Sequence, residues 1–194
     1  MYKFVLASSS PRRIDLLKSI GYEPDKIVPA NIDETPKIRE LPAKLAERLA
    51  LEKAVKIHEQ FPDSIILGAD TIVARGRLII PKPKDEIEAL KYLKLLSGRR
   101  HVVYTGICII KGEKCIKKVV QTKLKFKLLT NQEIDNLVKS NEWKDKSGGY
   151  ALQGMAGAYI SWISGHPSNV IGLPVHETYK ILSGIGLKQN IDIN

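Results

Sequence analysis

The segment Ser8–Arg13 places three serines, a proline and two arginines at the start of a predicted helix. Ser10 is typical of a helix N-cap, Pro11 of the first helical position, and Gly21 of a helix end. A helix N-terminus favours phosphate because its N–H groups are unpaired and its dipole is positive there, and arginine adds bidentate hydrogen bonds. The pattern predicts a phosphate site. A capped helix with two exposed arginines is the alternative.

Lys53 is a charged residue on the apolar side of a second predicted helix. At 100° per residue, the segment 43–57 puts it on one arc with Leu49, Ala46, Ile57, Ala50 and Ala54. An unpaired buried ammonium is costly. The side chain must therefore extend its charge to solvent, meet a carboxylate or point into a cleft that binds an anion.

Asp70 follows the apolar run Ile65–Leu67, within the sequence Gly-Ala-Asp-Thr at 68–71. The run predicts a buried strand that ends at these residues, and ligands of open α/β sheets gather beyond the carboxyl ends of strands. A carboxylate there could bind a metal or accept a proton, so Asp70 is the best single catalytic candidate. An aspartate that merely forms a turn is the alternative.

Two further acidic residues, Asp33 and Glu34, lie in a polar, proline-punctuated segment over 31–41 that predicts a loop. Together with Asp70 they could bind a hard cation, and oxygen ligands suit Mg²⁺ or Mn²⁺. The histidines at 58, 101, 166 and 176 lack the spacing of a zinc site, so zinc is not expected.

Strand-like and helix-like segments alternate along the chain, which indicates an α/β architecture in a single unit over 1–194. Capping boxes are predicted at Asp85 with Glu88 and at Thr130 with Glu133, and Gly112 predicts the turn of a long hairpin. Strands are expected over 2–7, near 27–28, and over 64–67, 71–80, 100–110, 114–128 and 159–163; helices are expected over 11–20, 42–60 and 85–98, from 130, and before 184.

The formal charge of +10 suggests a polyanionic partner, either phosphate groups or a nucleic acid. Part of the excess lies on one side of a single strand, where Gln121, Lys123, Lys125 and Lys127 alternate with Val120, Thr122, Leu124, Phe126 and Leu128. That pattern predicts a solvated lysine face opposite a core face. No basic motif interleaved with aromatic residues is found, so nucleic acid is not the expected partner.

The remaining composition favours a cytoplasmic protein. Apolar residues make up 43% of the chain, yet no segment approaches the length of a membrane span, and no signal-type segment opens the chain. Cys108 and Cys115 lie in strand-like sequence, so both are interpreted as small core residues of a reducing compartment, without a disulfide.

The order of these motifs resembles the Maf family. The matching blocks cover almost the whole chain: LASSSPRR, DE, LALEKA, GADTIV, PKP, SGRRHVVYTG, DKSGGYALQG and NVIGLPVHE. The resemblance implies a Maf and inosine-triphosphate-pyrophosphatase-like α/β fold, in which a mixed twisted sheet with flanking helices forms two lobes around a central cleft. It also implies frequent dimers, and hence a possible homodimer.

The family resemblance implies a nucleoside triphosphate pyrophosphatase that cleaves between the α- and β-phosphates with Mg²⁺ or Mn²⁺. Asp70 would then be the catalytic base, and Glu34 and Asp70 would hold the metal. Ser8, Arg12, Arg13, Lys53 and Lys82 would face the triphosphate. Arg99, Arg100 and Lys146 could add phosphate contacts, but exposed loop charge is the preferred interpretation of each.

The resemblance further implies a base preference. Arg12, Thr71 and Gln153 stand where the dTTP and UTP hydrolases of the family carry these residue types. The edge of uracil or thymine offers an acceptor, a donor and an acceptor, and a glutamine amide can both donate to it and accept from it. Two alternatives stay open: a nucleic-acid-associated regulator of cell division, and a purine triphosphate pyrophosphatase of the inosine type.

Overall fold

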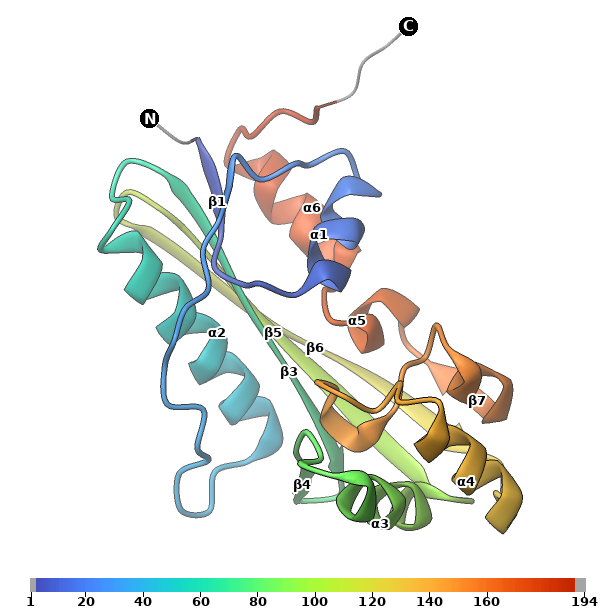
Figure 1. The fold of residues 1–194 in the computed structure, drawn as a ribbon. Helices are drawn as coiled ribbons and strands as arrows, with labels where there is room; N and C mark the ends of the chain where they lie inside the picture. Colours follow the sequence, from blue (N-terminus) through green and yellow to red (C-terminus); the bar gives the residue numbers. More distant parts are fainter. Residues whose placement is uncertain (1–2, 191–194) are drawn as a thin grey trace, which may run out of the picture.

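A seven-stranded mixed sheet organises the computed structural model, which describes residues 3–190 (Figure 1). The strands are β1 (Phe4–Leu6), β2 (Lys26–Ile27), β3 (Ile65–Arg75), β4 (Leu78–Ile80), β5 (Arg100–Lys111), β6 (Lys114–Phe126) and β7 (Ile160–Ser164). Their order is β2-β1-β3-β5-β6-β7, with β4 paired to β3. β1 runs parallel to β2 and β3, whereas the other pairs are antiparallel.

Helices cover both faces of the sheet (Figure 1). They are α1 (Pro11–Lys18), α2 (Pro42–His58), α3 (Glu86–Leu96), α4 (Asn131–Lys139), α5 (Pro167–Ile171) and α6 (Val175–Gly184), with short 3₁₀ turns at Ser147–Gly149 and Met155–Tyr159. None of the helices within residues 3–190 has the length and apolar character needed to cross a membrane.

Helix α2 packs unusually close to β3 and β5 because glycines face it. A Cβ built on Gly68 would lie 2.3 Å from the carbonyl oxygen of Ala50, and one on Gly106 would lie 2.1 Å from that of Ala46. No side chain fits in those gaps. The two glycines therefore let the helix backbone approach the sheet directly, which fixes the height of α2 above β3.

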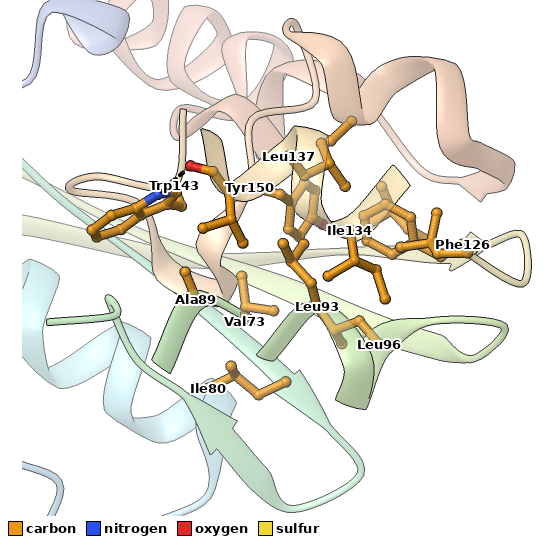
Figure 2. Close-up of a cluster of buried hydrophobic side chains, with 14 of the residues drawn as sticks. Val73, Ile80, Ala89, Leu93, Leu96, Phe126, Ile134, Leu137, Trp143 and Tyr150 are labelled. Atoms are coloured by element: carbon orange, nitrogen blue, oxygen red, sulfur yellow. Dashed lines mark hydrogen bonds between the residues drawn. The ribbon is translucent and has the colours of Figure 1, made fainter. Parts of the chain in front are cut away.

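The opposite face carries two separate apolar clusters. One packs α1 and α6 against the sheet through Leu17, Leu182, Leu67 and Ile107. The other packs α3 and α4 against the far ends of β3, β5 and β6, with Leu93, Leu137, Val73, Val103 and Phe126 among its members (Figure 2). The site described below lies between these two groups of helices and extends past β3 to the face that carries α2.

Most of the predicted elements are present. The capping box at Thr130 is complete, with hydrogen bonds in both directions between Thr130 and Glu133. At Asp85 the carboxylate caps Glu88 N–H, but Glu88 bonds to Lys84 N instead of returning to Asp85. Ser10 is an N-cap by position without a side-chain capping bond. Tyr2, in the first predicted strand, lies outside the described residues, and α5 was not predicted.

Three expectations about strands were wrong. The predicted break at 68–70 is absent: β3 continues to Arg75, because its pairing with β5 runs unbroken from Ile66 to Ala74. Leu128 is 78% exposed, because β6 ends at Phe126 and the core face ends with it. Cys115 is exposed and only Cys108 is buried; both thiols are free, with their sulfur atoms 3.6 Å apart.

Candidate active site

A cleft of about 880 Å³ lies between the two groups of helices and is within the usual size range of ligand pockets. Its wall is built from segments far apart in sequence: the turn at 7–13, the loop at 29–36, one side of α2, the middle of β3, the residues 79–82 and the loop at 144–153. All nine residues predicted for the site line this cleft: Ser8, Arg12, Arg13, Glu34, Lys53, Asp70, Thr71, Lys82 and Gln153.

The cleft crosses the sheet at a gap beside β3. On the side of β3 away from β5, strand β1 pairs with β3 only as far as Leu67, and β4 begins to pair with β3 at Val73. Within the described chain, residues 68–72 therefore have a strand neighbour on one side only, namely β5. Ser147 Oγ donates a hydrogen bond to Thr71 O at 3.1 Å across part of this gap. Asp70 thus reaches the cleft from the middle of a strand, not from a strand end.

Lys53 is the centre of the charged cluster on the α2 face. Its Nζ lies 2.5 Å from Asp70 Oδ1 and 2.5 Å from Glu34 Oε1. Lys53 and Asp70 are only 8% and 7% exposed. Of the three options open for this lysine, the structure shows the meeting with carboxylates, at the wall of the cleft. Burial by itself raises the pKa of Glu34, but the hydrogen bond and charge of Lys53, with Lys82 and Arg13, outweigh it and hold the pKa below its ordinary value.

Arg13 is buried and binds protein atoms on the opposite face of the sheet. Its Nη1 donates to Ser8 Oγ at 2.8 Å, its Nε to Gly172 O at 2.9 Å and its Nη2 to Thr71 Oγ1 at 3.4 Å. Burial lowers the pKa of Arg13, although the charge of Asp70 opposes the shift. The guanidinium therefore fixes the turn at Ser8 relative to β3 while it lines the cleft.

Thr71 continues this network inwards. Thr105 Oγ1 donates to Asn169 O at 2.8 Å, so in the 3.0 Å contact between the two threonines the hydrogen comes from Thr71. Asn169 in turn donates to Val103 O and Thr122 Oγ1, both at 3.1 Å. The polar chain from Arg13 to Asn169 thereby joins α1, β3, β5 and α5 behind the cleft.

A buried pair supports the loop at 144–153. Tyr150 lines the cleft, and its hydroxyl lies 2.6 Å from His101 Nε2. Burial lowers the pKa of His101 to about 4 and raises the pKa of Tyr150. The imidazole is therefore neutral at pH 7, and it holds Tyr150 in place through a hydrogen bond.

The loop at 144–147 supplies two lysines of the cleft wall, of which Lys144 was not a candidate and Lys146 was only a less favoured one. Lys146 was interpreted as an exposed loop charge; it is half-buried at the cleft wall, where burial and the charge of Arg12 lower its pKa. Arg12 Nη2 donates to Asp145 O at 3.3 Å, which brings this loop against α1. Lys144 lines the cleft too. The only sequence signal was a run of basic residues before paired glycines, a composition that also suits an exposed loop.

Other candidate residues lie elsewhere. Asp33 is exposed and bonds locally, its Oδ1 accepting from Thr35 N at 2.9 Å, so it does not line the cleft with Glu34. Arg99 and Arg100 are exposed and are not part of the wall. The expectation of exposed charge is confirmed for both arginines, but Arg100 begins strand β5 and lies over the ring of Trp162, so it is not a loop residue.

The carboxylates of Glu34 and Asp70 fit a divalent cation that takes its remaining ligands from a phosphate group and water. Within residues 3–190, no group of three or more histidine, cysteine or acidic side chains is arranged to hold a metal by itself. Glu34 and Asp70 nevertheless converge on one point, and each commits one oxygen to Lys53 while a carboxylate has two. Mg²⁺ commonly takes one or two carboxylates and completes its shell with phosphate and water oxygens. Two converging carboxylates are therefore sufficient protein ligands for such an ion.

The pattern of the family described as Maf-like protein matches residues 3–185. The chain belongs to the Maf family. Its relatives include a protein of Mesorhizobium japonicum named dTTP/UTP pyrophosphatase, which is 48% identical over 195 residues, 97% of this chain and 94% of the relative. A protein of Rickettsia rickettsii named nucleoside triphosphate pyrophosphatase is 52% identical over 189 residues, 95% of this chain and 88% of the relative.

A solved structure supports the fold of this Maf protein. A HAM1 protein from Coxiella burnetii superposes with a TM-score of 0.52 at 14% sequence identity, over 95% of this chain and 100% of that chain. At that identity the likeness concerns the fold alone. The predicted fold class and family are both confirmed.

Proposed function

We propose that this chain is a nucleoside triphosphate pyrophosphatase that hydrolyses dTTP and UTP to the monophosphate and pyrophosphate in the cytoplasm, with Mg²⁺ or Mn²⁺ as cofactor. The names of relatives at 47–48% identity over nearly the full chain support this substrate class. The observation that carries the proposal is Lys53 held between Glu34 and Asp70 in the wall of the cleft.

The charge of the cleft suits a triphosphate. Within residues 3–190 its lining has six cationic side chains, Arg12, Arg13, Lys53, Lys82, Lys144 and Lys146, against three carboxylates, Glu34, Asp70 and Asp145. Transfer at phosphorus needs little covalent chemistry from the protein, but it needs positive charge and donors around the phosphate oxygens. The excess of cations supplies that charge.

Asp70 is the proposed proton acceptor. Attack by water at the α-phosphorus forms a new P–O bond and breaks the bond to the oxygen that bridges to the β-phosphate. Pyrophosphate leaves with the electron pair, and Asp70 takes the proton that the water loses. Lys53 orients Asp70 for this role through the contact of 2.5 Å between Nζ and Oδ1, and Arg12 and Lys82 oppose the charge of the phosphate oxygens.

Glu34 and Asp70 are the proposed protein ligands of the divalent cation. When bound, Mg²⁺ or Mn²⁺ supplies Lewis-acid polarisation and charge neutralisation at the phosphates. Lys53 already satisfies one oxygen of each carboxylate, so the side chains are oriented before the cation and the substrate enter.

Gln153 is the proposed contact to the base. It is exposed at the cleft wall, where its amide is able to donate to and accept from a pyrimidine edge. The relatives with 51–52% identity carry a name that specifies no base, so the assay below includes purine triphosphates.

The test is a pyrophosphate-release assay over dTTP, UTP, dCTP, ITP and GTP, each with Mg²⁺, Mn²⁺ or EDTA. We expect release from dTTP and UTP with either metal and none with EDTA. A purine-only profile would contradict the base assignment while leaving the reaction intact. Turnover that persists in EDTA would contradict the cofactor. Steeply salt-dependent binding to nucleic acid without turnover would favour the regulatory alternative.

A further inference from the structure

The loop that carries Glu34 has little structure of its own. Residues 28–37 are neither helix nor strand, and 38–39 form a turn in which Arg39 has a φ of +59°, in the left-handed region. Ile38, at the tip, is 96% exposed, so apolar packing does not hold this end of the loop. At the other end, Ile32 packs against an apolar cluster of Leu45, Ala46, Leu49 and Ile72. Glu34 lies between these two ends, in the exposed part of the loop, so its side chain depends on polar ties to neighbouring elements.

Helix α2 supplies these ties from three successive turns. Lys56 bonds to the carbonyl of Asn31, Lys53 bonds to the carboxylate of Glu34, and Arg48 reaches the far side of the loop. At 100° per residue, Arg48, Lys53 and Lys56 fall within an arc of about 140°, so they share one side of the helix. The loop thus lies along α2 and is attached on both sides of Glu34.

Arg48 is the most extensively bonded of these residues. Its Nε and Nη2 form a fork with the two oxygens of Glu40, both at 2.8 Å, and Nη2 also donates to Thr35 O at 3.0 Å. Nη1 donates to both oxygens of Glu52 at 3.3 and 3.1 Å. These five hydrogen bonds use all the donors that a guanidinium has. Thr35 is the residue directly after Glu34, so the bond to its carbonyl constrains Glu34 itself.

The ion pair between Arg48 and Glu40 is well shielded. The side chains are 15% and 9% exposed, whereas those of the surface pair Lys18 and Glu23 are 54% and 61% exposed. The hydrogen bond to Glu40 raises the pKa of Arg48, and the same bond lowers the pKa of Glu40. Bidentate, partly desolvated pairs are the kind that holds a fixed geometry, and lysine cannot reproduce the fork. Glu40 also accepts from Lys37 N at 2.9 Å, which closes the turn around Arg39.

We propose that Arg48 is a positioning residue for the cation and phosphate subsite: by clamping Thr35 and Glu40 it sets Glu34 against Lys53 and Asp70. The proposal rests on the proposed function of Glu34 as a ligand. Arg48 itself is not assigned a contact with substrate. Its loss should free the loop and weaken the binding of the divalent cation, while the fold and the rest of the cleft remain.

The first measurement is the rate at which trypsin cleaves the loop, which requires no catalytic activity of the protein. Lys37 and Arg39 are trypsin sites inside the clamped turn, and Arg77, in the exposed turn between β3 and β4, is an internal reference site. Arg48→Met should raise the rate of cleavage after Lys37 and Arg39 by about tenfold relative to cleavage after Arg77, because a shielded charge-assisted pair is lost. Glu40→Gln should act in the same direction from the loop side. Lys44→Met is the matched control, since it removes an exposed ion pair with Glu47 on the same helix.

The second measurement concerns the cation. Binding of Mn²⁺ in the presence of an α,β-imido nucleotide, which cannot be cleaved, is followed by the electron paramagnetic resonance of free Mn²⁺. For Arg48→Met we expect binding about tenfold weaker, as found when an outer partner of a metal ligand is removed. Arg48→Lys should lie between this variant and the native chain, and Lys44→Met should match the native chain. The Mg²⁺ concentration for half-maximal pyrophosphate release should shift in the same order.

The outcomes separate the clamp from the proposed function. Faster loop cleavage together with weaker Mn²⁺ binding supports the clamp. Unchanged cleavage overturns it, and so does faster cleavage with unchanged Mn²⁺ binding, because the clamp would then serve the loop alone. If Arg48→Met does not fold, the same criteria apply to Glu40→Gln. Native protein that binds Mn²⁺ and nucleotide but releases no pyrophosphate refutes the proposed reaction and leaves the Mn²⁺ result to decide the role of Arg48.

Discussion

Asp70 and Thr71 are neighbours in β3, yet their side chains lie on opposite faces of the sheet. Asp70 pairs with Lys53 of α2, whereas Thr71 bonds to Thr105 and Arg13 on the other side. Successive side chains of a β-strand point to opposite faces of the sheet, so two neighbours such as these must be separated. One cleft reaches both residues because the stretch 68–72 lacks a strand neighbour on its outer side, so the cleft passes around the sheet edge.

Replacing Asp70 with asparagine should abolish the proposed proton transfer and keep the shape of the site. We expect kcat to fall by about 10²- to 10⁴-fold, the usual contribution of a general base, with little change in nucleotide affinity at saturating Mg²⁺. The Mg²⁺ concentration needed for binding should rise, because Asp70 is also a proposed ligand of the cation. Pyrophosphate release and equilibrium binding of an uncleavable nucleotide measure the two effects separately. Retention of native turnover would refute the assigned role of Asp70.

The close approach of α2 to the sheet should not tolerate a methyl group at Gly106. Gly106→Ala puts a Cβ 2.1 Å from Ala46 O, so the helix must move away, and we expect a loss of about 1 to 3 kcal/mol in unfolding free energy. Activity should also fall, because the shift separates Lys53 from Asp70. Urea denaturation and pyrophosphate release are the measurements.

Gly184→Ala is the control for this substitution. Within the described chain, a Cβ at Gly184 would meet nothing within 4 Å, and the residue ends helix α6. Its stability should be unchanged or slightly higher, since alanine is the better helix former. Equal destabilisation by both substitutions would contradict the close-packing explanation.

The buried His101 should make stability depend on acid pH. Its pKa is about 4 in the folded chain and 6.5 in the unfolded chain, so between these values only the unfolded state takes up the proton. Unfolding free energy should therefore fall as the pH drops from 6.5 to 4, by about 3 kcal/mol from this residue. His101→Gln, whose amide is still able to bond to Tyr150, should lack that part of the slope. Parallel curves for the two proteins in urea titrations would contradict the assignment.

Gln153 should affect which nucleobase the enzyme prefers more than it affects the hydrolysis of the phosphate bond. Gln153→Leu removes the amide but keeps the approximate volume, so kcat/KM for dTTP should fall about tenfold or more, with a smaller effect on ITP. The fall in kcat/KM is expected because loss of the amide leaves the polar edge of the pyrimidine without a hydrogen-bonding partner. The same ratio of dTTP to ITP turnover in both proteins would remove Gln153 from base recognition.

Several features of this protein followed from local sequence. The buried arc that includes Lys53 was visible in the helical period of 43–57, and the structure buries those positions. The box at Thr130 and the hairpin around Gly112 were read from local residue chemistry and are present. The residues expected for the site do line one cleft, because the family motifs specify their types along the chain.

Other features required the tertiary structure. Asp70 sits in mid-strand because β5 continues to pair beyond it, and Lys146 lines the cleft because Arg12 of α1 bonds to the neighbouring Asp145. The fork of Arg48 joins residues of a loop and a helix that periodicity alone does not bring together. The sequence by itself determined residue types, helices and turns, since these depend on neighbours a few positions away. Which strands leave a gap beside β3, and which side chains meet in it, was decided by hydrogen bonds and packing between distant segments.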